Sequence, residues 1–244
     1  MSKLPTFPIA LAILCVGWVV PANPSAPVSV DQVIHCYVQA IGGEAALDRV
    51  TTREVHAARH HGPKLTYYWQ KPDSVLLIEG KARIGWDGGS GWMLSSKKRV
   101  TKLSKGSQRP LQIDANPLRY AQLKQLYPDA EAAPGEQFDG QKMDVVQAPN
   151  DRGVTKLYFD SSTHLLRRIE ETGDSSAYFK HVTDFLDYQD VDGLKFPFRI
   201  VHSSNEPNAK PDDVRISKVM QNVPLKPGLF TKPSTSSVVL GGKR

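Results

Sequence analysis

The sequence predicts a mainly β (α+β) protein built on one curled antiparallel sheet, with an N-terminal helix and a central helix. Residues 154–203 contain four short segments rich in Tyr, Phe, Val, Ile and Leu, each bounded by turn residues such as Asp192-Gly193. Asp-Gly between two such segments is the strongest short-range hairpin signal, because a type I′ turn needs positive φ at both central positions. Helix signals are confined to two other places in the chain.

The first predicted helix ends near residue 41. Ser29 or Asp31 can cap its start, and apolar residues follow at helical spacing. Gly42-Gly43 can end it, because glycine tolerates the left-handed conformation of a helix C-cap. A further helical turn over 44–49 leads into the first strand.

From about residue 53 the hydrophobic pattern shortens to a period of two, which is typical of strands with one buried face. Besides the four segments of 154–203, strands are predicted at about 53–60, 64–70, 74–79, 82–87, 91–95, 99–104, 142–148 and 213–221. The second predicted helix covers residues 115–127. The segments around it, 106–114 and 128–140, are rich in Pro, Gly and charge and are predicted to be loops.

About a dozen strands are too many for a flat sheet, so the sheet has to curl, and curling around a helix creates an apolar concavity. If the sheet closes tightly, its own side chains fill the interior. If it stays open, a cavity remains with helix 115–127 as its lid. The lid residues predicted to face the interior are Leu118, Ala121, Leu126 and Tyr127.

Residues 1–26 are predicted to be a secretory signal peptide that is removed from the folded protein. An apolar run over 9–20 follows Lys3, and it is too short to span a bilayer. Cleavage is expected after Ala22, with Ala26 as the second choice. Lipid anchoring at Cys15 is not expected, because the residue before a lipid-modified cysteine is normally small and here it is leucine.

The rest of the chain is predicted to be a single domain over 27–235 with a disordered tail over 236–244, since no linker or repeat divides it. The net charge of +6 is thinly spread. Its densest run, Lys97-Lys98-Arg99 with Lys102 and Lys105, is either a solvated edge hairpin or a contact surface for anionic lipid headgroups. No nucleic-acid motif accompanies it, so no nucleic-acid partner is expected.

Neither metal nor catalytic chemistry has a sequence pattern that supports it. His56 and His60 share one strand face, but zinc needs three or four converging ligands and no such spacing is present. We therefore expect no metal, no cofactor and no catalytic residue. The alternative is an acid–base pair of a hydrolase, drawn from the acidic residues Asp160, Asp184, Asp187, Asp190 and Asp192. The simpler interpretation is that these carboxylates form turns or face solvent.

Apolar and aromatic strand residues are the best candidates for a binding site. The predicted cavity lining comprises Leu65, Tyr67, Trp69, Leu76, Ile78, Trp86, Trp92, Leu94, Phe196, Phe198 and Ile200. Such residues pack cores, and in a sheet this large they also line cavities. A cavity of this kind gains about 0.8 kcal/mol for each methylene of an acyl chain that it buries, so it needs few polar contacts.

A series of short motifs carries a resemblance to a known superfamily. The motifs are Tyr37 to Gly43, Lys71-Pro72-Asp73, Trp86-Asp87-Gly88, Gly91-Trp92, Phe138-Asp139-Gly140, Leu157 to Asp160, Leu165-Leu166, Asp184 to Pro197, Asn222 to Leu225 and Phe230. In their number and order they resemble outer-membrane lipoprotein-sorting proteins of the LolA/LolB-like superfamily. The resemblance implies an unclosed β-barrel whose mouth is plugged by helices and whose interior holds acyl chains. It implies no catalytic triad, and the carrier's ligand-gating arginine matches no position here.

Together these observations predict a periplasmic, non-enzymatic protein that binds or carries lipid or lipoprotein acyl chains. The expected partners are a lipid or acylated protein, a membrane protein and, transiently, a membrane surface. The alternative is an envelope-stress regulatory or protein-interaction module of the same fold. A periplasmic hydrolase that uses the acidic hairpin is the third interpretation.

Overall fold

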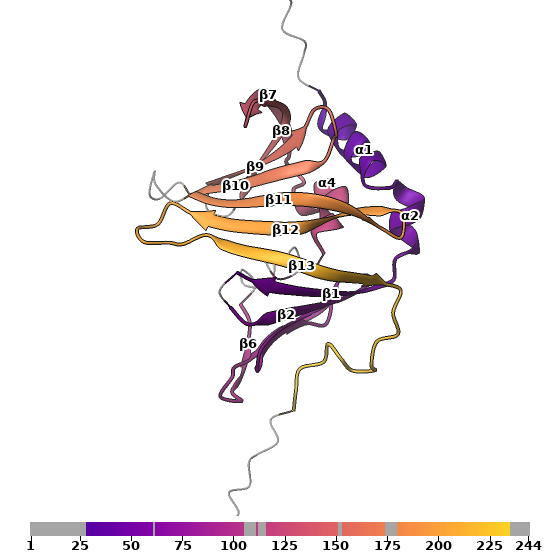
Figure 1. Ribbon diagram of the computed structural model, residues 1–244, viewed down its shortest axis with the longest axis vertical. Helices are drawn as coiled ribbons and strands as arrows, with labels where there is room; N and C mark the ends of the chain where they lie inside the picture. The colour runs from indigo at the N-terminus through magenta and orange to yellow at the C-terminus, as the bar shows by residue number, and fades with distance from the viewer. Residues whose placement is uncertain are drawn as a thin grey trace, which may run out of the picture.

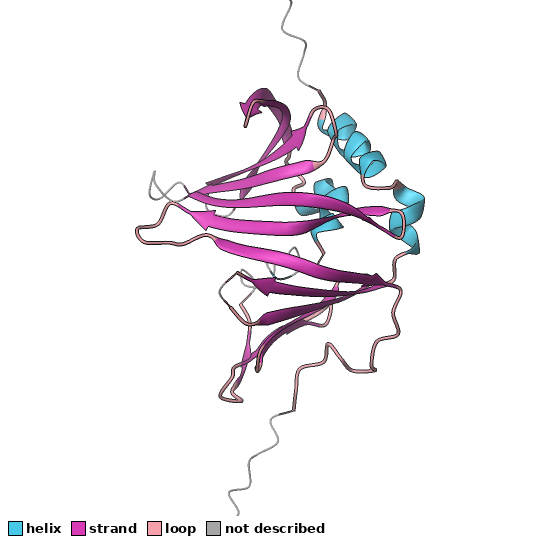
Figure 2. Cartoon of the chain, in the orientation of Figure 1, coloured by secondary structure: helices cyan, strands magenta, loops and turns pink. Residues whose placement is uncertain are grey.

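The computed structural model describes residues 28–60, 62–104, 111, 116–150, 153–173 and 180–234. The strands among them form one 13-stranded antiparallel sheet that curls and does not close (Figure 1). The few helices pack against one face of this sheet (Figure 2). The predicted fold class is therefore confirmed. The predicted signal peptide, with Cys15, and the predicted tail over 236–244 lie outside the described residues.

Two helices precede the sheet, and both agree with the sequence prediction. Helix α1 spans Val30–Ala40 and α2 spans Glu44–Arg49. Ser29, rather than Asp31, is the N-cap of α1, and its hydroxyl accepts a hydrogen bond from the amide of Gln32 at 3.2 Å. Gly42 follows α1 with φ of 125°, a conformation that only glycine adopts without strain.

All strands except β7 begin and end close to the predicted positions. They are β1 (Thr52–Arg59), β2 (Lys64–Gln70), β3 (Ser74–Glu79), β4 (Ala82–Trp86), β5 (Gly91–Leu94), β6 (Val100–Lys102), β7 (Glu131–Phe138), β8 (Gln141–Asn150), β9 (Gly153–Asp160), β10 (Leu166–Gly173), β11 (Lys180–Val191), β12 (Leu194–Ser204) and β13 (Asp212–Gln221). Their order in the sheet is β6-β5-β4-β3-β2-β1-β13-β12-β11-β10-β9-β8-β7.

This order places the first and last strands side by side at the centre of the sheet. The chain runs outward from β1 to the edge strand β6, crosses to the opposite edge at β7, and returns inward to β13. There β13 pairs antiparallel with β1, with Val55 opposite Val219. Because β6 and β7 are opposite edges, the connection between them has to cross a face of the sheet. We call residues 116–130 of this connection the crossing segment.

The crossing segment differs from the single helix predicted over 115–127. It contains a 3₁₀ helix η1 (Pro117–Gln122) and one turn of α-helix α4 (Leu123–Leu126). A segment this short gains little from helix propensity, so its packing decides its shape. Its deeply buried residues are Leu118, Tyr120, Leu123 and Tyr127, a spacing that one face of a regular helix does not provide.

The prediction that 128–140 is a loop was wrong, because β7 lies within it. As an edge strand, β7 has a strand partner on one side only, β8. It therefore tolerates Pro134 and a bulge between Ala133 and Glu136, features that would disrupt a central strand. Proline and a bulge also protect a sheet edge from unwanted pairing.

The sheet carries apolar clusters on both of its faces. We call the face covered by α1 and the crossing segment the inner face and the opposite one the outer face. On β3, Val75 and Leu77 belong to the large inner cluster, whereas Leu76 and Ile78 belong to a separate outer cluster. This follows from the alternation of side chains along a strand.

Residues 222–234, which follow β13 and which we call the C-terminal segment, cover part of the outer face. Trp92 is buried there with Leu76 and Phe230, and its indole Nε1 donates a hydrogen bond of 2.8 Å to the carbonyl oxygen of Phe230. Gly85 lies opposite Trp92 on β4, where a Cβ atom would stand 2.5 Å from the indole ring. Glycine at this position therefore makes room for the tryptophan.

Candidate functional site

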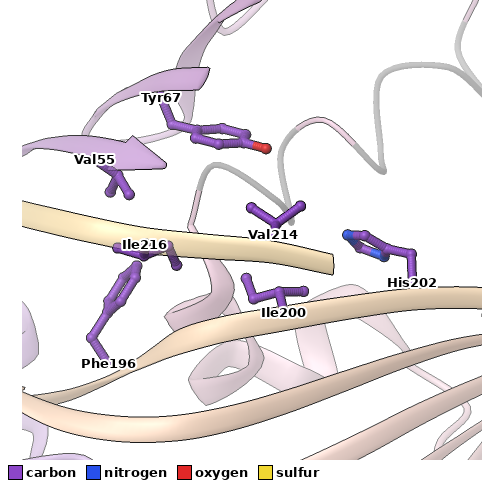
Figure 3. A pocket seen from close by; sticks show the side chains of 7 residues that line it. All are labelled: Val55, Tyr67, Phe196, Ile200, His202, Val214 and Ile216. Carbon is purple, nitrogen blue, oxygen red and sulfur yellow. The ribbon is translucent and has the colours of Figure 1, made fainter. Parts of the chain in front are cut away.

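A small pocket opens on the inner face where β1 and β13 meet (Figure 3). Its walls are Val55, Tyr67, Phe196, Ile200, His202, Val214 and Ile216, which come from β1, β2, β12 and β13. Its enclosed space is about 10 Å³, enough for about one water molecule, and the mouth of the pocket is open to solvent. In this state the inner face is therefore largely covered by the protein's own side chains.

Seven of the predicted lining residues lie in or against the inner cluster, namely Leu65, Tyr67, Trp69, Trp86, Phe196, Phe198 and Ile200. Of these, Tyr67, Phe196 and Ile200 also line the pocket. The aromatic rings of Phe196 and Phe198 meet edge to face with centroids 6.4 Å apart. The structure thus brings together residues from β2, β4 and β12 on one surface.

The other four predicted lining residues face away from this surface. Leu76, Ile78, Trp92 and Leu94 belong to the outer cluster beneath the C-terminal segment. Successive side chains along a strand point to opposite faces of the sheet. The prediction included residues of β3 to β5 from both faces, but only those of the inner face can line a cavity there. These four residues are accordingly removed from the candidate site.

The predicted lid residues do lie on the inner face. Leu118 and Tyr127 are buried in the inner cluster, and Ala121 and Leu126 are partly buried against it. Two further residues of the crossing segment were not predicted. Leu123 is fully buried. Tyr120 packs its ring against Phe185 with centroids 6.0 Å apart.

The sequence analysis also missed Arg53, a buried cation on the inner face. Its side chain is 2% exposed, and its guanidinium carbon lies 5.6 Å from the Trp69 ring centroid and 5.2 Å from that of Phe196. Nη1 donates a hydrogen bond of 2.6 Å to Oδ1 of Asn116, at the start of the crossing segment. Within the described parts of the chain, Nε has no hydrogen-bond partner and no carboxylate forms an ion pair with Arg53.

Burial lowers the pKa of Arg53 to about 10, so the guanidinium remains protonated at neutral pH. A signal for this residue was present in the sequence. Arg53 lies two residues from Val55 and four from Ala57 on β1, so its side chain points to the same face as these two residues, which are both buried in the inner cluster. Strand alternation alone therefore places an arginine on an apolar surface.

Replacing Arg53 by methionine should raise the free energy of unfolding by about 1 to 3 kcal/mol, because it removes a desolvated charge and keeps an unbranched side chain against the rings. Urea denaturation measures this change. The matched control is Arg59→Met, also on β1. Arg59 is half-buried and ion-paired with Asp212 at 2.8 Å, so its replacement should not stabilise the fold. A loss of stability in Arg53→Met would contradict the argument.

The acidic residues considered for hydrolysis have structural partners. Two hydrogen bonds of 2.6 and 3.0 Å hold the Asp184 carboxylate to the guanidinium of Arg168. Asp160 accepts hydrogen bonds from the Ser162 hydroxyl and from the backbone amides of Ser162 and Thr163, which together hold the pKa of Asp160 below its usual value despite its burial. Asp190 accepts the amide of Gly193 at 3.0 Å. Asp192 adopts positive φ in the turn after β11, and Asp187 is an exposed residue within β11 that also has positive φ.

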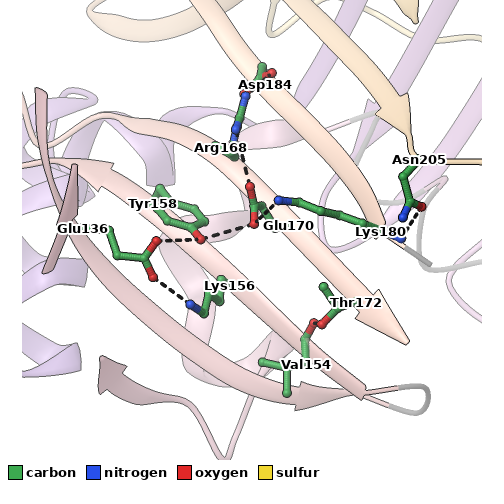
Figure 4. Close-up of polar contacts among 10 residues, drawn as sticks. All are labelled: Glu136, Val154, Lys156, Tyr158, Arg168, Glu170, Thr172, Lys180, Asp184 and Asn205. Carbon is green, nitrogen blue, oxygen red and sulfur yellow. Dashed lines mark hydrogen bonds and ion pairs between the residues drawn. The ribbon is translucent and has the colours of Figure 1, made fainter. Parts of the chain in front are cut away.

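Asp184 belongs to a polar network that crosses β7 to β11 (Figure 4). Tyr158 lies at its centre, with its hydroxyl 3.3 Å from carboxylate oxygens of both Glu136 and Glu170. Burial and these two carboxylates raise the pKa of Tyr158. Lys156 and Lys180 bind Glu136 and Glu170 at 2.7 and 2.9 Å. The network therefore cross-links neighbouring strands.

The structure gives His56, one of the histidines considered for metal binding, a carboxylate partner. His56 contacts Glu54 at 2.8 Å. Among the residues that the structure describes, no three His, Cys, Asp or Glu side chains converge as a metal site would require. No described helix is long and apolar enough to cross a membrane.

No family model matches the sequence, and no curated protein matches it. Solved structures do. A LolA superfamily protein from Nitrosomonas europaea is 13% identical with a TM-score of 0.57, over 84% of this chain and 98% of that one. A DUF1329 family protein from Desulfovibrio piger is 13% identical with a TM-score of 0.60, over 86% and 98%.

A third solved structure, described as an outer membrane lipoprotein-sorting protein domain from Vibrio parahaemolyticus, is 14% identical. Its TM-score is 0.51, and the match covers 75% of this chain and 88% of that one. At these identities the likeness concerns the fold. The resemblance drawn from the sequence motifs is confirmed at that level, and the chain has the fold of LolA superfamily and lipoprotein-sorting proteins.

Proposed function

We propose that this chain is an exported periplasmic protein that binds and carries acyl chains of lipids or lipoproteins, without catalysis. The observation that carries the proposal is the apolar inner face of the curled sheet, which is covered by a segment attached at both sheet edges. The predicted signal peptide over 1–26 supports export. The shared fold with a lipoprotein-sorting domain supports the ligand class.

Binding requires the crossing segment to give up its place to the ligand. Four of its aliphatic and aromatic side chains are deeply buried, namely Leu118, Tyr120, Leu123 and Tyr127. At about 1.5 to 3 kcal/mol each, exposing them costs on the order of 10 kcal/mol. A long acyl chain with about a dozen buried methylenes returns on the order of 10 kcal/mol. Because the two terms are similar, loading and release are both accessible, and a recipient that binds the chain more tightly drives transfer.

The direct test uses the mature chain, purified from its native envelope and analysed by native mass spectrometry. The same chain, stripped of ligand by unfolding and refolding, is titrated with a fluorescent fatty acid. We expect a retained or newly bound acyl ligand at one per chain. If the chain carries no acyl ligand and takes up none of the probe, the proposed function is wrong.

A matched pair of variants locates the site. Ile216→Trp fills the pocket wall on the inner face, so it should weaken binding of the fluorescent fatty acid at least about tenfold, the equivalent of 1.4 kcal/mol. Ile78→Trp adds the same bulk on the outer face and should leave the affinity unchanged. Both proteins are first checked for folding by circular dichroism. Equal effects of the two substitutions would place the ligand elsewhere.

A further inference from the structure

We propose that Arg53 recognises an acidic head group, so that the ligand is an anionic amphiphile: an acyl chain carrying a carboxylate or a phosphate. This inference rests on the proposed function and narrows its ligand class. The chemistry shared by the two acids is a negatively charged oxygen that accepts hydrogen bonds from the guanidinium.

The charge of Arg53 has no carboxylate partner among the described residues. Buried charges in proteins are normally paired, because an unpaired charge in an apolar site is costly. Around Arg53 the described contacts are two aromatic rings and the neutral amide oxygen of Asn116. The Nε atom is buried and has no described partner. A guanidinium offers five N–H donors, so this one has capacity for an oxyanion.

Arg53 lies beside the pocket. Val55, two residues along β1 on the same face, forms part of the pocket wall. Two residues of a strand span about 7 Å. Phe196 belongs to both places, because it lines the pocket and lies against the Arg53 guanidinium. A tail held at the meeting of β1 and β13 therefore brings its head group within reach of Arg53.

An acidic head group would compete with Asn116 for the Nη1 donor of Arg53. Asn116 occupies Nη1 with a hydrogen bond of 2.6 Å and immediately precedes η1. A carboxylate or phosphate oxygen carries a full negative charge and therefore attracts the guanidinium more strongly than the neutral amide oxygen does. An acidic head group therefore replaces the Asn116 amide as acceptor. The exchange removes one contact that holds the crossing segment against the sheet.

The test compares three probes with the same twelve-carbon tail, namely dodecanoic acid, dodecyl phosphate and dodecanol, on the ligand-free mature chain. Their affinities are measured by displacement of a fluorescent fatty acid or by calorimetry. We expect one or both acids to bind at least about tenfold more tightly than the alcohol, since the alcohol lacks the negative charge that attracts the guanidinium. The carboxylate and phosphate arms identify which acid is preferred.

Three variants make the test specific to Arg53. Arg53→Met should abolish the preference for the acid, so that the acid and dodecanol bind this variant with equal affinity. Asn116→Ala removes the competing acceptor and should tighten binding of the acid several-fold more than binding of dodecanol. Arg199→Met is the control, because Arg199 is already paired with Asp213 at 2.9 Å, and it should change neither affinity.

The outcomes separate the two proposals. If the acids and the alcohol bind equally well to the wild-type chain, or if Arg53→Met folds and retains the preference for the acid, the inference about Arg53 is wrong while acyl-chain binding stands. If Arg53→Met does not fold, Asn116→Ala decides, and an unchanged preference for the acid over dodecanol counts against the inference. If none of the three probes binds, the proposed function and the inference fail together.

Discussion

Replacing Trp92 by alanine is expected to lower the free energy of unfolding by about 4 kcal/mol, the usual cost of truncating a buried tryptophan. Trp92 is 2% exposed and packs with Leu76 and Phe230 on the outer face. The substitution also removes the indole donor from the carbonyl oxygen of Phe230. The C-terminal segment should therefore detach and become sensitive to limited proteolysis, while acyl-chain binding on the inner face persists.

Urea denaturation and a proteolysis time course measure the two effects of this change. The matched variant is Trp69→Ala, which removes an inner-face tryptophan beside Arg53. It should lower both the stability and the affinity for the fluorescent fatty acid, without releasing the C-terminal segment. Were Trp92→Ala to fold and yet lose ligand binding, the assignment of the site to the inner face would be contradicted.

Replacing Gly42 by alanine is expected to cost about 3 kcal/mol. A side chain at φ of 125° is strained, and its Cβ would stand 2.2 Å from the carbonyl oxygen of Gly193 and 2.8 Å from the Leu194 side chain. Positive φ accounts for about 1 to 2 kcal/mol and overpacking for about 1 to 3 kcal/mol. Relief requires α1 to move away from the β11–β12 turn, where Lys195 donates its amide to the carbonyl of Ile41.

Gly193→Ala is the control for this prediction. Gly193 also has positive φ, at 82°, but nothing lies within 4 Å of the position its Cβ would take. The control should therefore show the conformational cost alone, about 1 to 2 kcal/mol. Thermal and urea unfolding report both variants. Equal losses in the two proteins would mean that the close contact of Gly42 with the hairpin has no energetic weight.

Local patterns were sufficient to predict most elements of the fold. The strands β2 and β3 start and end where the period of two and the turn residues place them. Ser29 and Gly42 bound α1 as helix-capping preferences indicate. These features depend on neighbouring residues only, which is why a single sequence reveals them.

Features set by tertiary pairing were predicted less well. The strand β7 contains Pro134 and glycine, and only its place at a sheet edge makes it a strand. The crossing segment takes its shape from the surface beneath it. The alternation along β3 and β5 does not by itself say which residues face inward, so Leu76 and Trp92 were assigned to the inner face although they lie on the outer one. Arg53 was missed because a charged residue in a strand is ordinarily taken as exposed.

The pairing of β1 with β13 also has a consequence for how the chain folds. The two strands are made at opposite ends of synthesis, so contacts such as Val55 opposite Val219 give the topology a high contact order and favour slow folding. Until β13 arrives, one side of β1 is an open edge with unpaired amide and carbonyl groups, a form prone to aggregation. A nascent chain of this topology thus exposes an extended strand until the C-terminal half has emerged.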